Sequence, residues 1–214
     1  MDSRVLIDGL LAYIGLVILF AFHEFGHAWM AWKCGDSTGK DEGRCSLNPL
    51  VHLDLLGSVI MPLLMIFSGP GFAGFLLGWA KPVPVNLNNL RNPKLDDILI
   101  TLAGPWMNLL LAVGLIGIAR IGIAIGSPNL QDFCVRTAVT SLGLFFFNLV
   151  PIPPLDGSRI VRVLVGMSLE TYAEIARFSY ILIMLVMFVT PIPNLLRHAT
   201  ESSLRIICGW FGLS

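Results

Sequence analysis

Residues 5–32 read VLIDGLLAYIGLVILFAFHEFGHAWMAW, an apolar stretch long enough to cross the hydrocarbon layer of a membrane as a single helix. Its charged or imidazole side chains are Asp8 near the start and the cluster His23, Glu24 and His27 near the end. Residues four apart lie on one face of a helix, so the two imidazoles can bind the same metal ion. Ionisable groups at membrane depth are costly, and we therefore expect this cluster to be functional.

The motif His23-Glu24-x-x-His27 has the spacing found in zinc peptidases, in which the two histidines hold the metal. Glu24 directly follows the first histidine and can act as a general base toward water at the metal. The motif therefore predicts metal-assisted peptide hydrolysis inside the bilayer. The stretch is too long for a signal peptide, so we expect it to remain in the mature protein.

The composition is that of a membrane protein. Of the 214 residues, 55% are apolar and 13% are charged, about half the charged share of a soluble globule, and the mean hydropathy is +0.78. The formal net charge is zero, which gives no case for a nucleic-acid partner. The four cysteines lack C-x-x-C spacing, so they predict neither a disulfide framework nor a thiolate zinc site.

The apolar pattern predicts an all-α, polytopic membrane protein. About four stretches are apolar enough to span the bilayer, namely residues 5–32, 98–125, 135–150 and 175–189. Residues 195–211 carry several charges and predict an interfacial or peripheral helix. Neither a repeat nor a long linker divides the sequence, so residues 1–214 are expected to form a single membrane-embedded domain.

Residues 56–79 are also apolar, but Ser68-Gly69-Pro70-Gly71 divides them into halves too short to span alone. They can form either a kinked spanning helix or a re-entrant helical hairpin that enters and leaves on the same side. Residues 80–90 are expected to be extended, because Pro82 and Pro84 keep the residues before them out of helical dihedrals. Such a segment is either a strand that binds unwound substrate by β-augmentation or a Pro-rich connector.

A catalytic zinc usually has three protein ligands, and Asp156 is the best partner for the two histidines. It follows an apolar helix and the unwinding stretch Pro151–Pro154, where a carboxylate at membrane depth needs a counter-charge such as a metal ion. The alternative is an aspartate that caps the next helix and pairs with Arg159 or Arg162.

Together these residues resemble the site-2 protease family of intramembrane zinc metalloproteases. The resemblance rests on three motifs, which are His23-Glu24-x-x-His27, Gly104-Pro105-x-x-Asn108 and Asn148-x-x-Pro151-x-Pro153-x-Leu155-Asp156-Gly157. It implies one Zn²⁺ per chain held by His23, His27 and Asp156. It also implies Glu24 as the catalytic glutamate and Asn108 as a residue near the bound substrate. The sequence contains no PDZ or CBS module, so the resemblance is to a short form of the family.

The position of Asp156 bears on the topology. To meet the histidines, it must lie on the side where the first span exits at Trp32, which favours the re-entrant hairpin over a spanning helix at 56–79. That side then carries nine of the 14 Lys and Arg residues. The positive-inside rule places it, and the metal site nearest to it, toward the cytoplasm. We expect the membrane to be the plasma membrane of a prokaryote.

Three other polar residues have open roles. Asn108 lies at membrane depth, where an asparagine either bonds a neighbouring helix or holds the substrate, and the resemblance favours the substrate. His52 is either an additional active-site group or a loop histidine bonded to Asp54, and the loop role is favoured. Asn148 is expected to hold the unwound segment that follows it.

The sequence thus predicts a zinc endopeptidase that cuts peptide bonds within or near the transmembrane segments of single-span membrane proteins. We expect the protein to lie in the lipid bilayer, where an accessory protein can regulate it in trans. One alternative is a metal or proton transporter that uses the same midplane His, Glu and Asp residues. Another is an inactive relative that only binds membrane helices, although a pure binder has no need of a charged metal site.

Overall fold

The computed structural model describes residues 3–68 and 78–213 of the chain. Regular structure in these residues is helical, apart from an isolated antiparallel bridge between Leu53 and Ala80. The predicted all-α class is therefore confirmed. Most of the second half of the apolar stretch 56–79, with the predicted break at Gly69-Pro70-Gly71, lies outside the described residues.

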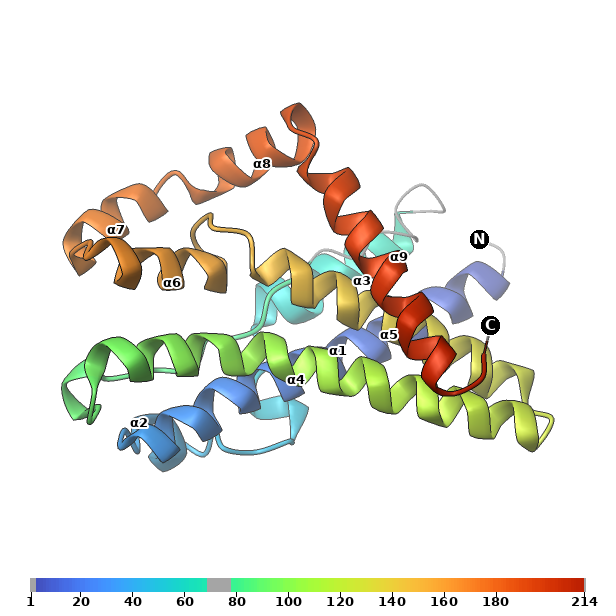
Figure 1. The fold of residues 1–214 in the computed structure, drawn as a ribbon. Coiled ribbons are helices and arrows are strands. Elements are labelled where there is room, and N and C mark those ends of the chain that lie inside the picture. The colour runs from blue at the N-terminus through green and yellow to red at the C-terminus, as the bar shows by residue number, and fades with distance from the viewer. Residues whose placement is uncertain (1–2, 69–77, 214) are drawn as a thin grey trace.

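Three long helices form the centre of the bundle, with α4 packed against both of the others (Figure 1). They are α1, Ser3–Cys34; α4, Pro93–Ala124; and α5, Pro128–Asn148. Among the described residues, α1 and α4 are each long and apolar enough to cross a membrane, as predicted. α5 begins earlier than the predicted Val135, because Pro128 is a favourable first residue for a helix. Its early turns therefore include the charged pair Asp132 and Arg136.

The main apolar core lies between α4 and α5 and is closed by α9, Ile192–Trp210. Small and branched side chains meet there, namely Ala112, Ile116, Ala138, Leu142 and Ile207. The alanines allow the backbones of α4 and α5 to approach closely, as is usual for helices packed in membranes. The helix expected at 195–211 is thus present, and one of its faces is part of the core. Its position at the bilayer surface stays a prediction.

The predicted span 175–189 is not one straight helix. Residues Leu169–Ala176 form α7, residues Ser179–Val189 form α8, and the two are bent by 63°. α7 carries Glu170 and Glu174, whereas α8 carries no charged residue, so the apolar part of this region begins only with α8. If the bent pair is counted as one span, the described residues contain up to three candidates.

The connection between α1 and α4 leaves and returns at the same end of the bundle. The Arg91 N–H donates a hydrogen bond to the Cys34 carbonyl at 3.2 Å, which joins the end of α1 to the start of α4. The connection contains α2, Thr38–Asp41; a 3-10 turn, Pro49–Val51; a π-helical turn, Leu55–Ile60; α3, Met61–Phe67; and a second 3-10 turn, Leu87–Asn89. The predicted extended segment is present over residues 80–86, before that last turn.

The two ends of the stretch 56–79 also lie side by side. The Trp79 N–H donates to the Gly57 carbonyl at 3.2 Å, and the Ser58 hydroxyl donates to the Trp79 carbonyl at 2.6 Å. The stretch therefore begins and ends at the same place in the fold.

Candidate metal centre

His23 and His27 lie one turn apart on the inner face of α1, and both are buried. Their Nε2 atoms are 3.1 Å apart, and their rings meet edge to face with centroids at 4.7 Å. Two imidazoles that turn the same ring nitrogen toward one point are arranged as a pair of metal ligands. The spacing of four residues along α1 is what brings them together.

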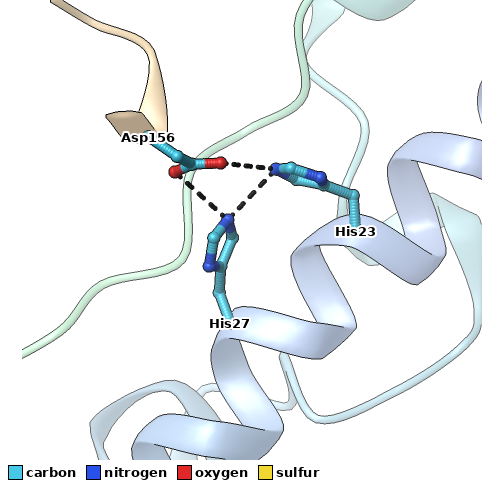
Figure 2. A group of neighbouring side chains, drawn as sticks. All are labelled: His23, His27 and Asp156. Carbon is cyan, nitrogen blue, oxygen red and sulfur yellow. Dashed lines mark hydrogen bonds and ion pairs between the residues drawn. The ribbon is translucent and has the colours of Figure 1, made fainter. Parts of the chain in front are cut away.

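Asp156 completes the group from a distant part of the sequence (Figure 2). Its Oδ2 lies 3.3 Å from His23 Nε2, and its Oδ1 lies 3.5 Å from His27 Nε2. Each of the three residues offers one ligand atom, and these atoms all lie within 4.8 Å of one another. The structure therefore brings together the three residues that the sequence predicts as ligands.

The start of α6, Asp156–Val165, holds the carboxylate in place. The unwound residues 149–155 lead into it, with a cis peptide between Pro153 and Pro154. A Cβ on Gly157 would lie only 2.5 Å from the Leu149 carbonyl carbon, so a larger residue cannot pack there. The Asn148 side-chain amide donates to the Leu144 carbonyl at 3.0 Å, which satisfies the last turn of α5 before the chain unwinds.

Asp156 does not pair with the arginines that follow it. Arg159 instead donates to Asp97 Oδ1 at 3.0 Å, and Arg162 donates to the other oxygen of the same carboxylate. Asp97 is buried in the first turns of α4, so this ion pair ties α6 to α4. The helix-capping alternative for Asp156, with Arg159 or Arg162 as partner, is therefore wrong.

α4 forms the back wall of the site. His27 Nδ1 donates to the Ile100 carbonyl at 2.7 Å, which leaves Nε2 free to face Asp156. Gly104 lies directly behind the two rings: a Cβ there would be 2.5 Å from His27 Cε1 and 2.8 Å from His23 Cε1. The glycine of the motif Gly104-Pro105-x-x-Asn108 thus allows α4 to pack against the metal-binding face of α1.

The donor set fits a zinc ion. Asp156 Oδ2 is buried and has no hydrogen-bond donor among the described residues, so its negative charge lacks a partner other than the neighbouring imidazoles. Two imidazole nitrogens and one carboxylate form a common ligand set of catalytic zinc, which keeps a further position for water or substrate. The three side chains share a cavity of about 400 Å³ with Glu24, from which that position can be reached.

Glu24 is buried beside the histidines and is held by the extended segment 80–86. The Val83 N–H donates to Glu24 Oε2 at 3.0 Å. The Arg44 guanidinium, also buried, donates to the carbonyls of Lys81 and Pro82 at 2.5 and 2.9 Å and so fixes the peptide next to Val83. Binding of a substrate strand by β-augmentation needs unpaired N–H groups along this segment, and in this structure the Val83 N–H is already occupied by Glu24.

Asn108 is buried against His23, with a side chain that is only 1% exposed. Its amide nitrogen lies 3.2 Å from His23 Nδ1, and its backbone carbonyl accepts from the Ser141 hydroxyl at 2.6 Å. The residue therefore contacts a metal-ligand candidate and also lines the 400 Å³ cavity. A contact with substrate, as predicted from the resemblance, stays a proposal.

His52 lies outside this group. Its Nε2 contacts the Ser46 carbonyl at 2.7 Å, and burial together with the nearby Arg44 charge lowers its pKa, although the Ser46 contact and Glu24 oppose the shift. The Asp54 carboxylate, which was expected to bond His52, instead accepts from the N–H groups of Leu56 and Gly57 and caps the π-helical turn. His52 is thus a loop residue, as favoured from the sequence, but it contacts Ser46 rather than Asp54.

Three contacts that shape the site were not predicted from the sequence: Val83 with Glu24, Arg44 with residues 81–82, and Asp97 with the arginines of α6. Asp97 carries a signal, a charge at the start of the predicted span 98–125, whereas Arg44 lies in a polar loop and carries none. Their partners are 37 or more positions away, and the sequence pattern does not connect them.

This chain is similar to proteins named as zinc metalloproteases. The profile of peptidase family M50 matches residues 114–190, which include Asp156. A Bacillus subtilis (strain 168) protein named "Putative zinc metalloprotease YwhC" is 39% identical over 210 residues, which are 92% of this chain and 91% of that protein. A protein of the same description named Rip2, from Mycolicibacterium smegmatis, is 33% identical over 86% of this chain and 71% of its own length. The Rip2 of Mycobacterium tuberculosis (strain H37Rv) is 28% identical over 84% of this chain and 67% of its own length. No solved structure gives a significant match.

Proposed function

Because the chain belongs to peptidase family M50, the site-2 protease family, and is a zinc metalloprotease, we propose that it cuts peptide bonds within or next to the transmembrane segments of other membrane proteins. The observation that carries this proposal is the buried cluster of His23, His27 and Asp156, because its two histidines lie on α1, a helix long and apolar enough to cross a membrane.

The zinc ligands are His23 Nε2, His27 Nε2 and a carboxylate oxygen of Asp156. Zinc bound there supplies a Lewis acid that polarises a carbonyl and makes water more acidic. Ile100 fixes the ring of His27 through its carbonyl, and Gly157 allows the start of α6 to bring Asp156 to the histidines. The chain therefore supplies a rigid, preformed set of three ligands.

Glu24 is the general base. Val83 N–H occupies its Oε2, which leaves Oε1 to take a proton from water and later to return it to the leaving amine. A fixed carboxylate is effective in this role because its position is set before the substrate arrives. Asn108 lines the same cavity and contacts the substrate backbone there.

The substrate is a single-span membrane protein whose helix unwinds at the site. A helix hides its carbonyls in its own hydrogen bonds, so the cut must fall where the helix is broken. Apolar side chains such as Phe20, Leu144, Phe147 and Ile183 line the cavity next to the polar residues, which suits an unwound segment that arrives from lipid. An accessory protein can regulate access to the cavity in trans.

The topology comprises about four spans, with residues 56–79 as a re-entrant hairpin. Support comes from the paired ends of that stretch, Gly57 and Trp79, and from the contact of Cys34 with Arg91, since a crossing segment would end at the opposite face. The zinc site faces the cytoplasm of a prokaryotic cell. Lys33 and Lys40 stack on Trp32 at 4.7 and 4.0 Å, an arrangement suited to the positively charged inner interface.

A purified, lipid-reconstituted preparation tests this function with a model single-span substrate. The wild-type protein is expected to bind about one zinc per chain and to cut a span that contains helix-breaking residues in preference to an all-Leu span. Glu24→Gln should keep the zinc and lose the cleavage. Cleavage that survives in Glu24→Gln would contradict the proposed role of this residue.

The transporter alternative finds no support in the comparisons, and the same preparation separates it from a protease. A transporter would move metal ions or protons across the reconstituted bilayer and leave every model span intact. An inactive helix-binding relative would retain the model span without cutting it.

A further inference from the structure

The two histidines share a feature that their motif does not predict: each has its second ring nitrogen against α4. His27 Nδ1 donates to the Ile100 carbonyl at 2.7 Å, and His23 Nδ1 lies 3.2 Å from the side-chain amide of Asn108. The partner of His27 is a backbone group that every sequence would supply. The partner of His23 is the side chain of Asn108, and a substitution can therefore remove it.

An imidazole that binds a metal through Nε2 keeps its proton on Nδ1, and that proton needs an acceptor. The Ile100 carbonyl is such an acceptor for His27. At His23 the amide nitrogen of Asn108, itself a donor, faces Nδ1, an arrangement that suits the opposite tautomer with its proton on Nε2 toward Asp156. When a metal binds His23, the Asn108 atom that faces Nδ1 thus has to change from the amide nitrogen to the amide oxygen.

Asn108 can make this change without moving from its place. A half-turn of its amide exchanges the two ends and brings Oδ1 to His23 Nδ1. Oδ1 is buried and has no hydrogen-bond partner among the described residues, so the half-turn also satisfies that atom. The Ser141 hydroxyl meanwhile donates to the Asn108 backbone carbonyl at 2.6 Å, and Asn108 is only 1% exposed.

We propose that Asn108 is the positioning residue for His23: its side-chain oxygen accepts the Nδ1 proton, sets the ring orientation and so strengthens zinc binding through Nε2. This role is additional to the proposed contact with substrate, because it operates before any substrate is present. Loss of an acceptor that orients a ligand histidine typically weakens metal affinity by about 10- to 100-fold.

Zinc affinity, measured by competition with a colorimetric chelator in the absence of substrate, tests the proposal. Asn108→Leu keeps the volume and removes the acceptor, so its zinc dissociation constant should rise by about 10- to 100-fold. Asn108→Asp keeps an acceptor at the same position and should bind zinc within a few-fold of wild type. Ser141→Ala is the matched control, because it removes a buried hydrogen bond to the Asn108 backbone but leaves the amide in place.

If Ser141→Ala weakens zinc binding as much as Asn108→Leu does, the effect is general loosening of the helix pair and the proposal is wrong. It is also wrong if Asn108→Leu binds zinc as tightly as wild type while its cleavage of the model span falls, which is the result expected for a substrate contact. The inference rests on the proposed zinc site but not on proteolysis. A wild-type protein that binds no zinc would therefore refute the zinc site itself, an outcome distinct from these.

A second measurement follows the hydrogen bond itself. In zinc-loaded protein with ¹⁵N-labelled histidine, and with His23 assigned, the Nδ1 proton should exchange slowly with water in the wild type and in Asn108→Asp but faster in Asn108→Leu. Equal exchange rates in the three proteins would overturn the proposal.

Discussion

Substitution of Gly104 by alanine is predicted to weaken zinc binding by at least about 100-fold. Gly104 lies on α4 directly behind the two histidine rings, and a Cβ added there would be 2.5 Å from His27 Cε1 and 2.8 Å from His23 Cε1. No rotation of a methyl group relieves such contacts, because the Cβ position is fixed by the backbone.

The magnitude follows from the distances. To reach an ordinary van der Waals separation of 3.4 Å, the His27 ring must retreat by about 0.9 Å. Metal–ligand distances tolerate changes of only about 0.2 Å, so the retreat removes His27 from the site. We expect zinc affinity to fall by at least about 100-fold, the upper end of what the loss of a supporting contact costs. By helix propensity alone the substitution would stabilise α4, since alanine is more favourable than glycine within a helix by about 1 kcal/mol.

Gly114→Ala is the matched control on the same helix, because a Cβ at Gly114 meets nothing within 4 Å. Zinc content after dialysis against a weak chelator, together with the melting temperature of each protein, separates local from global effects. Gly114→Ala should retain its zinc and melt no earlier than wild type. If Gly104→Ala retains zinc as wild type does, α4 does not back the metal site as described.

Three further predictions concern contacts around the site. Val83→Pro removes the N–H that holds Glu24, in a segment that already contains Pro82 and Pro84. The kcat for the model span should therefore fall roughly 10- to 100-fold at unchanged KM, whereas Val83→Ala keeps the N–H and should keep the rate. A fall in both variants would assign the effect to the Val83 side chain instead. Asp97→Asn leaves Arg159 and Arg162 without their carboxylate and should lower the free energy of unfolding by about 3 kcal/mol or more. The control Asp132→Asn, at the exposed pair with Arg136, should lower it by less than about 1 kcal/mol. Equal losses would contradict a structural role for the buried pair. Burial and the Arg44 charge lower the pKa of His52, so folding favours the neutral imidazole. The stability that this contributes is present above the unfolded-state pKa of about 6.5 and is lost as the pH falls through the lower folded-state pKa. Unfolding followed from pH 7.5 to 5 should show this acid loss, His52→Gln should reduce it, and the same change at the exposed His198 should not.

The metal site could be predicted from sequence because its determinants are local. Histidines four apart on a helix share a face whatever the rest of the chain does, so His23 and His27 required no tertiary information. Asp156 was harder, and it was found because prolines before it and Gly157 after it mark an unwound stretch at membrane depth. The resemblance to the site-2 proteases then joined the two motifs.

The contacts that support the site could not be predicted in this way. The partner of Glu24 is a backbone N–H that carries no sequence signal, and Asp97 meets its arginines only because α4 and α6 pack together. The bend between α7 and α8 was missed because the apolar residue Ile175 precedes it, and the predicted span was extended back through Arg177. Hydropathy locates apolar stretches, but polar residues at their ends decide where a helix breaks.

Anomalous diffraction at the zinc absorption edge, from crystals of the zinc-loaded protein, tests the central claim most directly. A single peak bonded at about 2.0–2.2 Å to His23 Nε2, His27 Nε2 and a carboxylate oxygen of Asp156 is the predicted result. A peak whose ligands omit any of these three residues, or zinc held instead by cysteine thiolates, would contradict it.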